Sequence, residues 1–230
     1  RNAAIGTFVC AALFAAAWIN SQGRHIGHLQ PGAPELRADS RYNQDATRIV
    51  EKFDLGLDVL SVVVETPKDG CYDHATMEYL NQFGWQMANV PGVVSVTSVA
   101  WLAKQAFSGF NEGNPKWAAL PRDPKSLANA ISLAPEGSGL YNPGCTVLPV
   151  HLYLADHKAS TIKAVTGAVK AFRDANPDPR IAVRLASGNV GVQAATNEVL
   201  ETTELRMMLY VYLTIVALVL LTYRDWRAML

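Results

Sequence analysis

The sequence feature that most constrains the fold is an uncharged stretch near the C-terminus, Met207 to Tyr223 (MMLYVYLTIVALVLLTY). About seventeen apolar residues are at the short end of the length that spans a bilayer core as a helix. Arg224 and Arg227 follow directly, which is typical of the cytoplasmic flank of a membrane helix. The alternative is a buried helix of a soluble core, but such a helix rarely stays apolar on every face. The stretch therefore predicts a membrane-spanning helix.

A second apolar run, Ala3 to Ile19, is rich in alanine and carries no charge. Trp18 occupies the place of an interfacial aromatic residue, and the small residues suit close packing of membrane helices. A signal peptide is the alternative, with Arg1 as its basic start and Ala15–Ala17 near its cleavage site. We favour a transmembrane helix over 1–21. Both chain ends are then cytoplasmic, and residues from about 20 to 204 lie on the far side of the membrane.

Composition and motifs exclude several classes of function. Lys plus Arg equals Asp plus Glu, so nothing indicates a nucleic-acid partner. The sequence contains no phosphate-binding glycine loop, zinc-protease motif or nucleophile elbow. His25 and His28 are three residues apart, but in a glycine-containing segment that does not indicate a metal site. We therefore expect no enzyme activity, no cofactor and no bound metal. Because the chain does not begin with Met, we expect it to be part of a larger protein.

Between the apolar runs, the pattern alternates between strands and helices. A segment over 22–58 contains an amphipathic packing helix that Asp39 or Ser40 caps and that ends near Phe53. Strands are expected at 59–66, 93–100, 147–155 and 181–185, and helices follow the N-caps Asp73 and Asp156. The order βαββαβ is that of an α+β, ferredoxin-like domain, here over 59–188 with an insertion at 102–146. A short helix is expected within the insertion, at 124–131.

The three cysteines bear on this topology. In a ferredoxin-like sheet the first and third strands are antiparallel central neighbours, so the end of one meets the start of the other. Cys71 follows the first strand and Cys145 precedes the third, which predicts a Cys71–Cys145 disulfide and an oxidising compartment. Two unpaired thiols are the alternative. Pro149 is unexpected in a central strand, and a bulge or a later strand start would accommodate it.

Two further features bear on function. Neither glycine nor proline occurs between Val192 and Leu230, so a helix starting near Asn189 is expected to run over 189–226 into the second membrane span. The insertion carries apolar side chains that could cover the domain or line a substrate path: Phe107, Phe110, Trp117 and Leu120. Packing is the interpretation that we favour for these four residues.

Four segments together resemble the RND (resistance–nodulation–division) superfamily of exporters, in its hydrophobe/amphiphile branch with MMPL-like domains. They are PGAPELRADSRYNQD at 31–45, ETPKDGC at 65–71, NEGNPKWAALPRD at 111–123 and TYRDWRAML at 222–230. The resemblance covers the whole chain, and its first segment is more similar to the second half of such a transporter. The chain differs from the large multidrug pumps in having one ferredoxin-like unit rather than a tandem pair.

The resemblance implies a periplasmic porter segment of a proton-driven transporter in the bacterial inner membrane. Implied partners are the lipid bilayer, a hydrophobic or amphiphilic substrate (a lipid or drug), the remaining transporter helices, a second porter domain and a homo-oligomer. Neither apolar run contains an acidic residue, so the proton-carrying residues would belong to other helices. The alternatives are a membrane-anchored extracytoplasmic interaction or sensor domain without transport activity and, more distantly, an extracellular enzyme.

Overall fold

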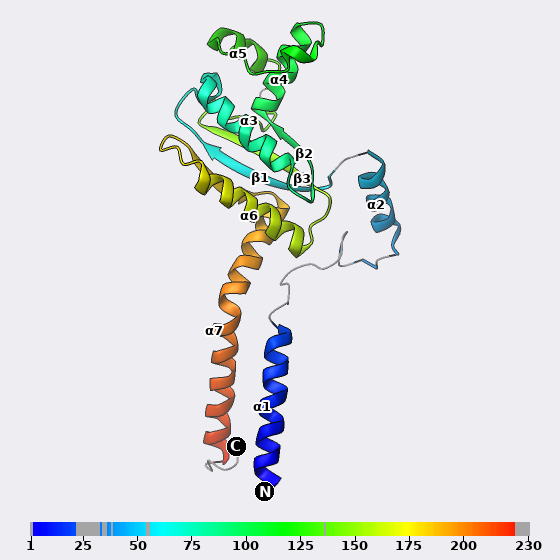
Figure 1. The fold of residues 1–230 in the computed structure, drawn as a ribbon, viewed down its shortest axis with the longest axis vertical. Helices are drawn as coiled ribbons and strands as arrows, with labels where there is room; N and C mark the ends of the chain where they lie inside the picture. Colours follow the sequence, from blue (N-terminus) through cyan, green and yellow to red (C-terminus); the bar gives the residue numbers. More distant parts are fainter. Residues whose placement is uncertain are drawn as a thin grey trace.

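The computed structural model describes residues 2–21, 33, 36–37, 39–53, 56–135 and 137–223. Within these ranges the chain has a mixed α+β architecture with seven α-helices and one four-stranded sheet. Two long helices, α1 (Asn2–Ser21) and α7 (Asn189–Tyr223), run side by side away from the sheet, as Figure 1 shows. The first residues of α1 and the last residues of α7 lie at the same end of the molecule (Figure 1).

The sheet contains β1 (Asp58–Glu65), β2 (Val93–Ser98), β3 (Val147–Leu154) and β4 (Ala182–Ser187). Its spatial order is β2-β3-β1-β4, and every neighbouring pair is antiparallel. The first and third strands are therefore antiparallel neighbours at the centre of the sheet, as the sequence predicts. The first residue of each of the four strands lies within two residues of the predicted one.

The hydrophobic core lies between one face of the sheet and two helices, α3 (His74–Ala88) and α6 (Ala159–Ala175). Alternate residues of the central strands point into it, as the two-residue period of a strand requires. These strand residues are Leu60, Val62, Val64, Leu148, Val150, Leu152 and Leu154. The helices contribute Met77, Leu80, Phe83, Met87, Ile162, Val165, Val169 and Phe172. The rings of Phe83 and Phe172 meet edge to face, with centroids 5.1 Å apart, and join the two helices.

Pro149 lies inside β3, so the predicted bulge or later strand start is wrong. The strand begins at Val147 and keeps its register through the pair Val63↔Pro149. The neighbouring strand β2 pairs with β3 only as far as Ser98↔Val150. At Pro149, β3 therefore has a neighbour on one side only, which is the edge condition under which a sheet tolerates proline.

The N-caps of the two core helices differ from each other. Asp73 caps α3 as predicted, because its side chain accepts a hydrogen bond from the backbone N–H of Thr76. Asp156 does not cap α6, whose N-cap is Lys158. Asp156 instead accepts hydrogen bonds from the Lys158 backbone N–H at 3.2 Å and from Thr161 Oγ1 at 2.6 Å. It thereby holds the turn that precedes the helix.

The Asp73 cap gives α3 a pH-dependent contribution to stability. Hydrogen bonding from the Thr76 side chain lowers the pKa of Asp73 below its ordinary value of 3.8. A lowered folded-state pKa stabilises the fold above pH 3.8, and this stabilisation is lost as the pH falls through the folded-state pKa. We expect Asp73→Ala to reduce the free energy of unfolding by about 1 kcal/mol at neutral pH. Urea unfolding of Asp73→Ala against wild type checks this, and Asp73→Asn, which keeps the cap without its charge, is the matched control. Wild type should have a larger free energy of unfolding than Asp73→Asn at neutral pH, and the difference should shrink as the pH falls. A difference that does not shrink would contradict the role of the carboxylate.

The insertion after β2 is more helical than the sequence predicts. The segment at 99–100, expected to be strand, instead begins α4 (Val99–Phe110), because the Ser98 side chain accepts a hydrogen bond from the Trp101 N–H and caps it. A 3-10 turn, η2 (Pro115–Trp117), follows, and then α5 (Pro124–Ile131), which matches the predicted short helix. Buried Leu127 and Ile131 attach α5 to the core.

The amphipathic helix of the N-terminal segment is present as α2 (Arg41–Phe53). Ser40 caps it, since its Oγ accepts a hydrogen bond from the Asn43 N–H at 3.3 Å. In the part of the chain that the structure describes, two residues on its apolar side are exposed, and its packing stays a prediction. Tyr42 and Phe53, on its apolar side, are 63% and 68% exposed. The helix stands beside the domain rather than against it (Figure 1).

Candidate functional site

Helix α7 joins the domain directly to the apolar C-terminal stretch. It begins at Asn189, next to the last strand, and continues without a break for 35 residues to Tyr223. Its first turns contact β1 and β4, and Val190 is fully buried in the core. At 1.5 Å per residue, the helix extends for about 50 Å. The predicted unbroken helix is therefore present over the described residues, whereas Arg224 and Arg227 lie outside them.

Gly188 makes the sharp turn from β4 into α7. Its φ is +88°, and a Cβ at this position would lie 2.5 Å from the backbone oxygen of Val59. We expect Gly188→Ala to destabilise the domain by about 2 kcal/mol or more, because left-handed strain adds to this clash. Gly167→Ala is the matched control: Gly167 lies within α6 with open space around its Cα, so this change should stabilise by up to about 1 kcal/mol. Thermal unfolding of both variants tests this, and equal melting temperatures would contradict it.

The outer half of α7 has the composition of a membrane span. Among the described residues, one helix, Asn189–Thr222, is long and apolar enough to cross a membrane. Its most apolar 18-residue window has a mean hydropathy of 2.1 and is 0% buried. Within the described residues, this window is therefore not buried in the domain core. α1 also has exposed apolar side chains, including Phe14 at 70% and Ile19 at 73%.

Two lysine–glutamate pairs connect α6 to the part of α7 nearest the domain. Lys163 Nζ donates to Glu201 Oε1 at 2.7 Å, and Lys170 Nζ lies 3.0 Å from Glu198 Oε2. All four side chains are between 41% and 69% exposed. Exposed pairs of this kind contribute at most about 1 kcal/mol each to stability. They therefore favour the observed orientation of the two helices but do not fix it.

A cleft of about 390 Å³ lies between α6 and α7 beside these ion pairs. Its walls combine small and polar side chains with the two pairs. The lining residues from α6 include Ile162, Lys163, Thr166, Gly167 and Lys170, and those from α7 include Ala194, Asn197, Glu198, Glu201 and Thr202.

A larger, apolar groove of about 1010 Å³ lies between α1 and α7. From α1 it is lined by Phe14, Ala17 and Trp18, whose two aromatic rings stack with centroids 6.2 Å apart. From α7 it is lined by Glu201, Glu204, Leu205, Met208, Leu209, Tyr212, Leu213 and Val216. Acidic side chains thus border the end of the groove nearest the domain. The side chains that line the rest of the groove are aliphatic or aromatic.

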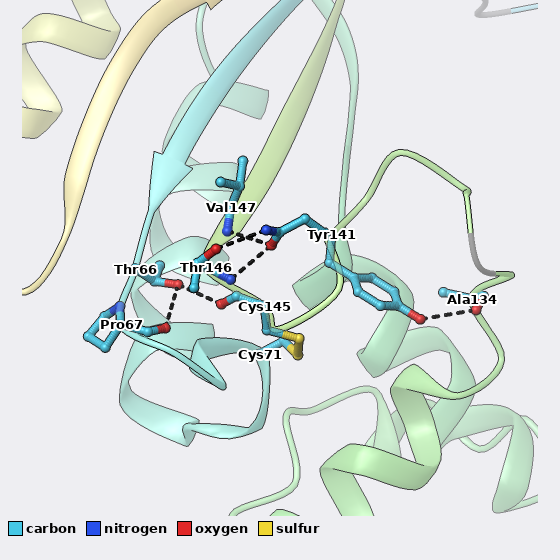
Figure 2. The surroundings of a disulfide bond; sticks show 9 residues. Thr66, Pro67, Cys71, Ala134, Tyr141, Cys145, Thr146 and Val147 are labelled. Atoms are coloured by element: carbon cyan, nitrogen blue, oxygen red, sulfur yellow. Dashed lines mark hydrogen bonds between the residues drawn. A yellow bond between two sulfur atoms is a disulfide. The ribbon is translucent and has the colours of Figure 1, made fainter.

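The predicted disulfide between Cys71 and Cys145 is present, with Cα atoms 5.4 Å apart. It ties η1 (Gly70–Tyr72) to the loop that precedes β3, as Figure 2 shows. Thr66 Oγ1 donates to the Cys145 carbonyl at 2.9 Å beside it (Figure 2). Both half-cystines are almost fully buried. The disulfide is compatible with an extracytoplasmic location for the domain.

The four residues predicted to cover the domain or line a substrate path do not form one surface. Leu120 is buried in the core, whereas Phe110 is 55% exposed. Phe107 and Trp117 pack edge to face with ring centroids 5.6 Å apart. They belong to α4 and η2, at the end of the domain farthest from α1 (Figure 1). None of these four residues lines the cleft or the groove described above, so their role as a cover or in a substrate path stays a prediction.

No group of three or more His, Cys, Asp or Glu side chains that could hold a metal ion occurs among the described residues. His25 and His28 lie outside those residues. Ser61 Oγ lies 2.8 Å from His151 Nδ1, and the other ring nitrogen of His151 lies 3.4 Å from the backbone oxygen of Gly139. Since Ser61 and His151 are register partners on β1 and β3, this contact is a cross-strand hydrogen bond.

The sequence predicted neither the partners of Glu198 and Glu201 nor the two cavities. The available signal was charge spacing. Lys163 and Lys170 are seven residues apart on one face of α6, and Glu198 and Glu201 are three apart on α7. Compared with models of protein families and with curated proteins, the chain matches none of them.

Proposed function

We propose that this chain is the extracytoplasmic porter segment, with its flanking membrane helices, of a proton-driven RND-type transporter that exports hydrophobic or amphiphilic compounds. The observation that carries the proposal is the continuity of α7. One helix has Val190, in its first turn, buried in the domain core, and its last seventeen residues, Met207 to Tyr223, uncharged. Movement of the domain is therefore transmitted to the membrane, and the apolar groove beside α7 offers a path for hydrophobic molecules.

We also propose that the domain is ferredoxin-like. The strand order β2-β3-β1-β4, the antiparallel pairing, and the positions of α3 between β1 and β2 and of α6 between β3 and β4 in the chain all support this. In such a domain α3 and α6 cover the same face of the sheet, in agreement with the core that they share.

We place the chain in the bacterial inner membrane, with α1 as a second span and the domain in the periplasm. Support for α1 comes from its 20 helical residues, its lack of charge and its position beside α7 (Figure 1). The common end of α1 and α7 is then cytoplasmic. Neither Ala3–Ile19 nor Met207–Tyr223 carries an acidic residue, so protons would move through other helices of the transporter. A second porter domain and a homo-oligomer belong to the same proposal.

The alternative function is a membrane-anchored interaction or sensor domain without transport. It is favoured by exposed aromatic side chains at the far end of the domain, where Trp101 and Trp117 are 45% and 47% exposed. A sensor would transmit binding at this end through α7 without moving a substrate.

Accumulation of a hydrophobic dye in cells tests the proposal. Cells expressing the full-length protein should accumulate less dye than cells without it, and an uncoupler of the proton gradient should abolish the difference. Changing acidic residues of the other membrane helices to their amides should have the same effect as the uncoupler. Equal accumulation in all of these cells would favour the sensor.

A further inference from the structure

The two cavities beside α7 lie on one continuous face of that helix. The cleft is lined by Ala194 and Glu198, the groove by Leu205 and Met208, and Glu201 lines both. These positions recur at intervals of three or four residues, which places them on the same side of an α-helix. Helix α6 faces this stripe near the domain and α1 faces it along the apolar stretch. The cleft and the groove therefore meet at Glu201 and form one elongated surface.

This surface changes in chemistry along its length. The groove offers aromatic and aliphatic walls, including Trp18, Met208 and Tyr212, and its 1010 Å³ is at the upper end of the usual range for ligand sites. The cleft offers two ammonium and two carboxylate groups within the same 390 Å³. An apolar region that adjoins a region with charges of both signs matches an amphiphile whose headgroup carries both charges.

The cleft charges can exchange partners at small cost. The Lys163–Glu201 and Lys170–Glu198 pairs are solvent-exposed, and exposed pairs are weak. A phosphate can accept hydrogen bonds from the lysines, and a primary ammonium can donate to the glutamates, so all four charges stay neutralised. Charge-assisted hydrogen bonds of this kind are stronger than neutral ones.

We propose that the joined cavities bind a zwitterionic phospholipid with a primary amine, with its acyl chains in the α1–α7 groove and its headgroup in the α6–α7 cleft. The proposal rests on the proposed function in naming the class of amphiphile that the segment handles. Binding itself requires only the chain described here.

Quenching of Trp18 fluorescence tests the site directly, because this side chain lines the groove. The 230-residue chain in detergent micelles is titrated with brominated-chain phosphatidylethanolamine, phosphatidylglycerol or diacylglycerol. Subtraction of the Trp18→Phe signal isolates Trp18 from the other four tryptophans. Phosphatidylethanolamine is expected to bind at least about tenfold more tightly than the other two lipids, the effect of one charge-assisted hydrogen bond. Equal quenching by the three lipids would mean non-selective lipid contact and would overturn the proposal.

Gly167→Leu blocks the cleft without harming the fold. A Cβ added at Gly167 would have nothing within 4 Å, and leucine favours a helix more than glycine does. The variant should lose the preference for phosphatidylethanolamine. Gly109→Leu is the matched control, because Gly109 is also helical with open space around it but lies in α4, away from both cavities. A preference retained in Gly167→Leu would overturn the assignment of the headgroup to the cleft.

A charge variant provides a second readout. Lys170→Gln should weaken binding of phosphatidylethanolamine, whereas Arg173→Gln, on the same helix but paired with Asp174 outside the cleft, should not. Equal affinity of the two variants would overturn the role of Lys170. The assay contains no transport step. Loss of selective binding with export intact would therefore refute this site alone, and selective binding without proton-driven export would refute the proposed function alone.

Discussion

Replacing both Cys71 and Cys145 by alanine is expected to lower the free energy of unfolding of the domain by about 4 kcal/mol. The disulfide joins residues with a sequence separation of 74, and a chain-entropy treatment assigns about this value to a loop of that size. The loss is large because the closed loop is long, extending through α3, β2, α4 and α5. Without the bond, the unfolded chain regains the conformations that the closed loop excludes.

Urea unfolding followed by circular dichroism measures this difference in detergent micelles. Both proteins carry Cys10→Ala, so that no other thiol can form a mixed disulfide. Dithiothreitol should lower the stability of the protein that retains Cys71 and Cys145 to that of the double variant, and should leave the double variant unchanged. A stability difference below about 1 kcal/mol would contradict the account, because it is smaller than any common disulfide contribution for a long loop.

Insertion of two glycines after Thr202 is expected to reduce export by the full-length protein to the level of cells that lack it. The site lies between Glu201, which pairs with the domain, and the uncharged stretch that starts at Met207. Glycine within a helix costs about 1 kcal/mol per residue relative to alanine, so the insertion makes α7 flexible where it leaves the domain. Under the proposed function, domain movement then no longer reaches the membrane span.

An insertion of two alanines at the same position is the control. It produces the same change in length and rotation but keeps the helix stiff. Dye accumulation and protein level are measured together, and thermal unfolding of the domain should be the same in both variants. Normal export by the glycine variant would refute rigid coupling through α7. Equal loss in both variants would assign the defect to helix rotation rather than flexibility, and would also contradict the expectation.

Local patterns predicted the sheet and the disulfide because these depend on short-range chemistry and one topological rule. The β-branched residues of β1 and the alternation in β3 define the strands, and the Asp73 cap defines the start of α3. Once the first and third strands are central neighbours, Cys71 and Cys145 lie at the same edge. No long-range packing information was required for that step.

Features that depend on tertiary contacts were not predictable in the same way. The segment VTSVA has β-branched residues typical of a strand, but the Ser98 side chain ends β2 and caps α4. Pro149 is tolerated because β2 stops one pair earlier, and no property of Pro149 itself indicates this. Helix α2 has an apolar side typical of a packed helix, but Tyr42 and Phe53 are exposed in the described chain.

The cavities were beyond sequence reasoning because each forms between helices that are distant in the sequence. The cleft requires α6 to lie against residues 194–202 of α7, and the groove requires α1 to lie beside the apolar half of α7. The charges of the cleft were visible as Lys163, Lys170, Glu198 and Glu201. Their pairing across two helices depends on the crossing of α6 and α7, which the sequence does not specify.

Transport by the purified full-length protein in liposomes tests the central claim most directly. A hydrophobic fluorescent dye is loaded into the vesicles, and a pH gradient is imposed with the acidic side facing the porter domain. We predict that dye leaves the cytoplasmic side only while the gradient lasts, and that the glycine insertion after Thr202 stops it. Dye movement at the same rate with and without the gradient would contradict proton-driven transport.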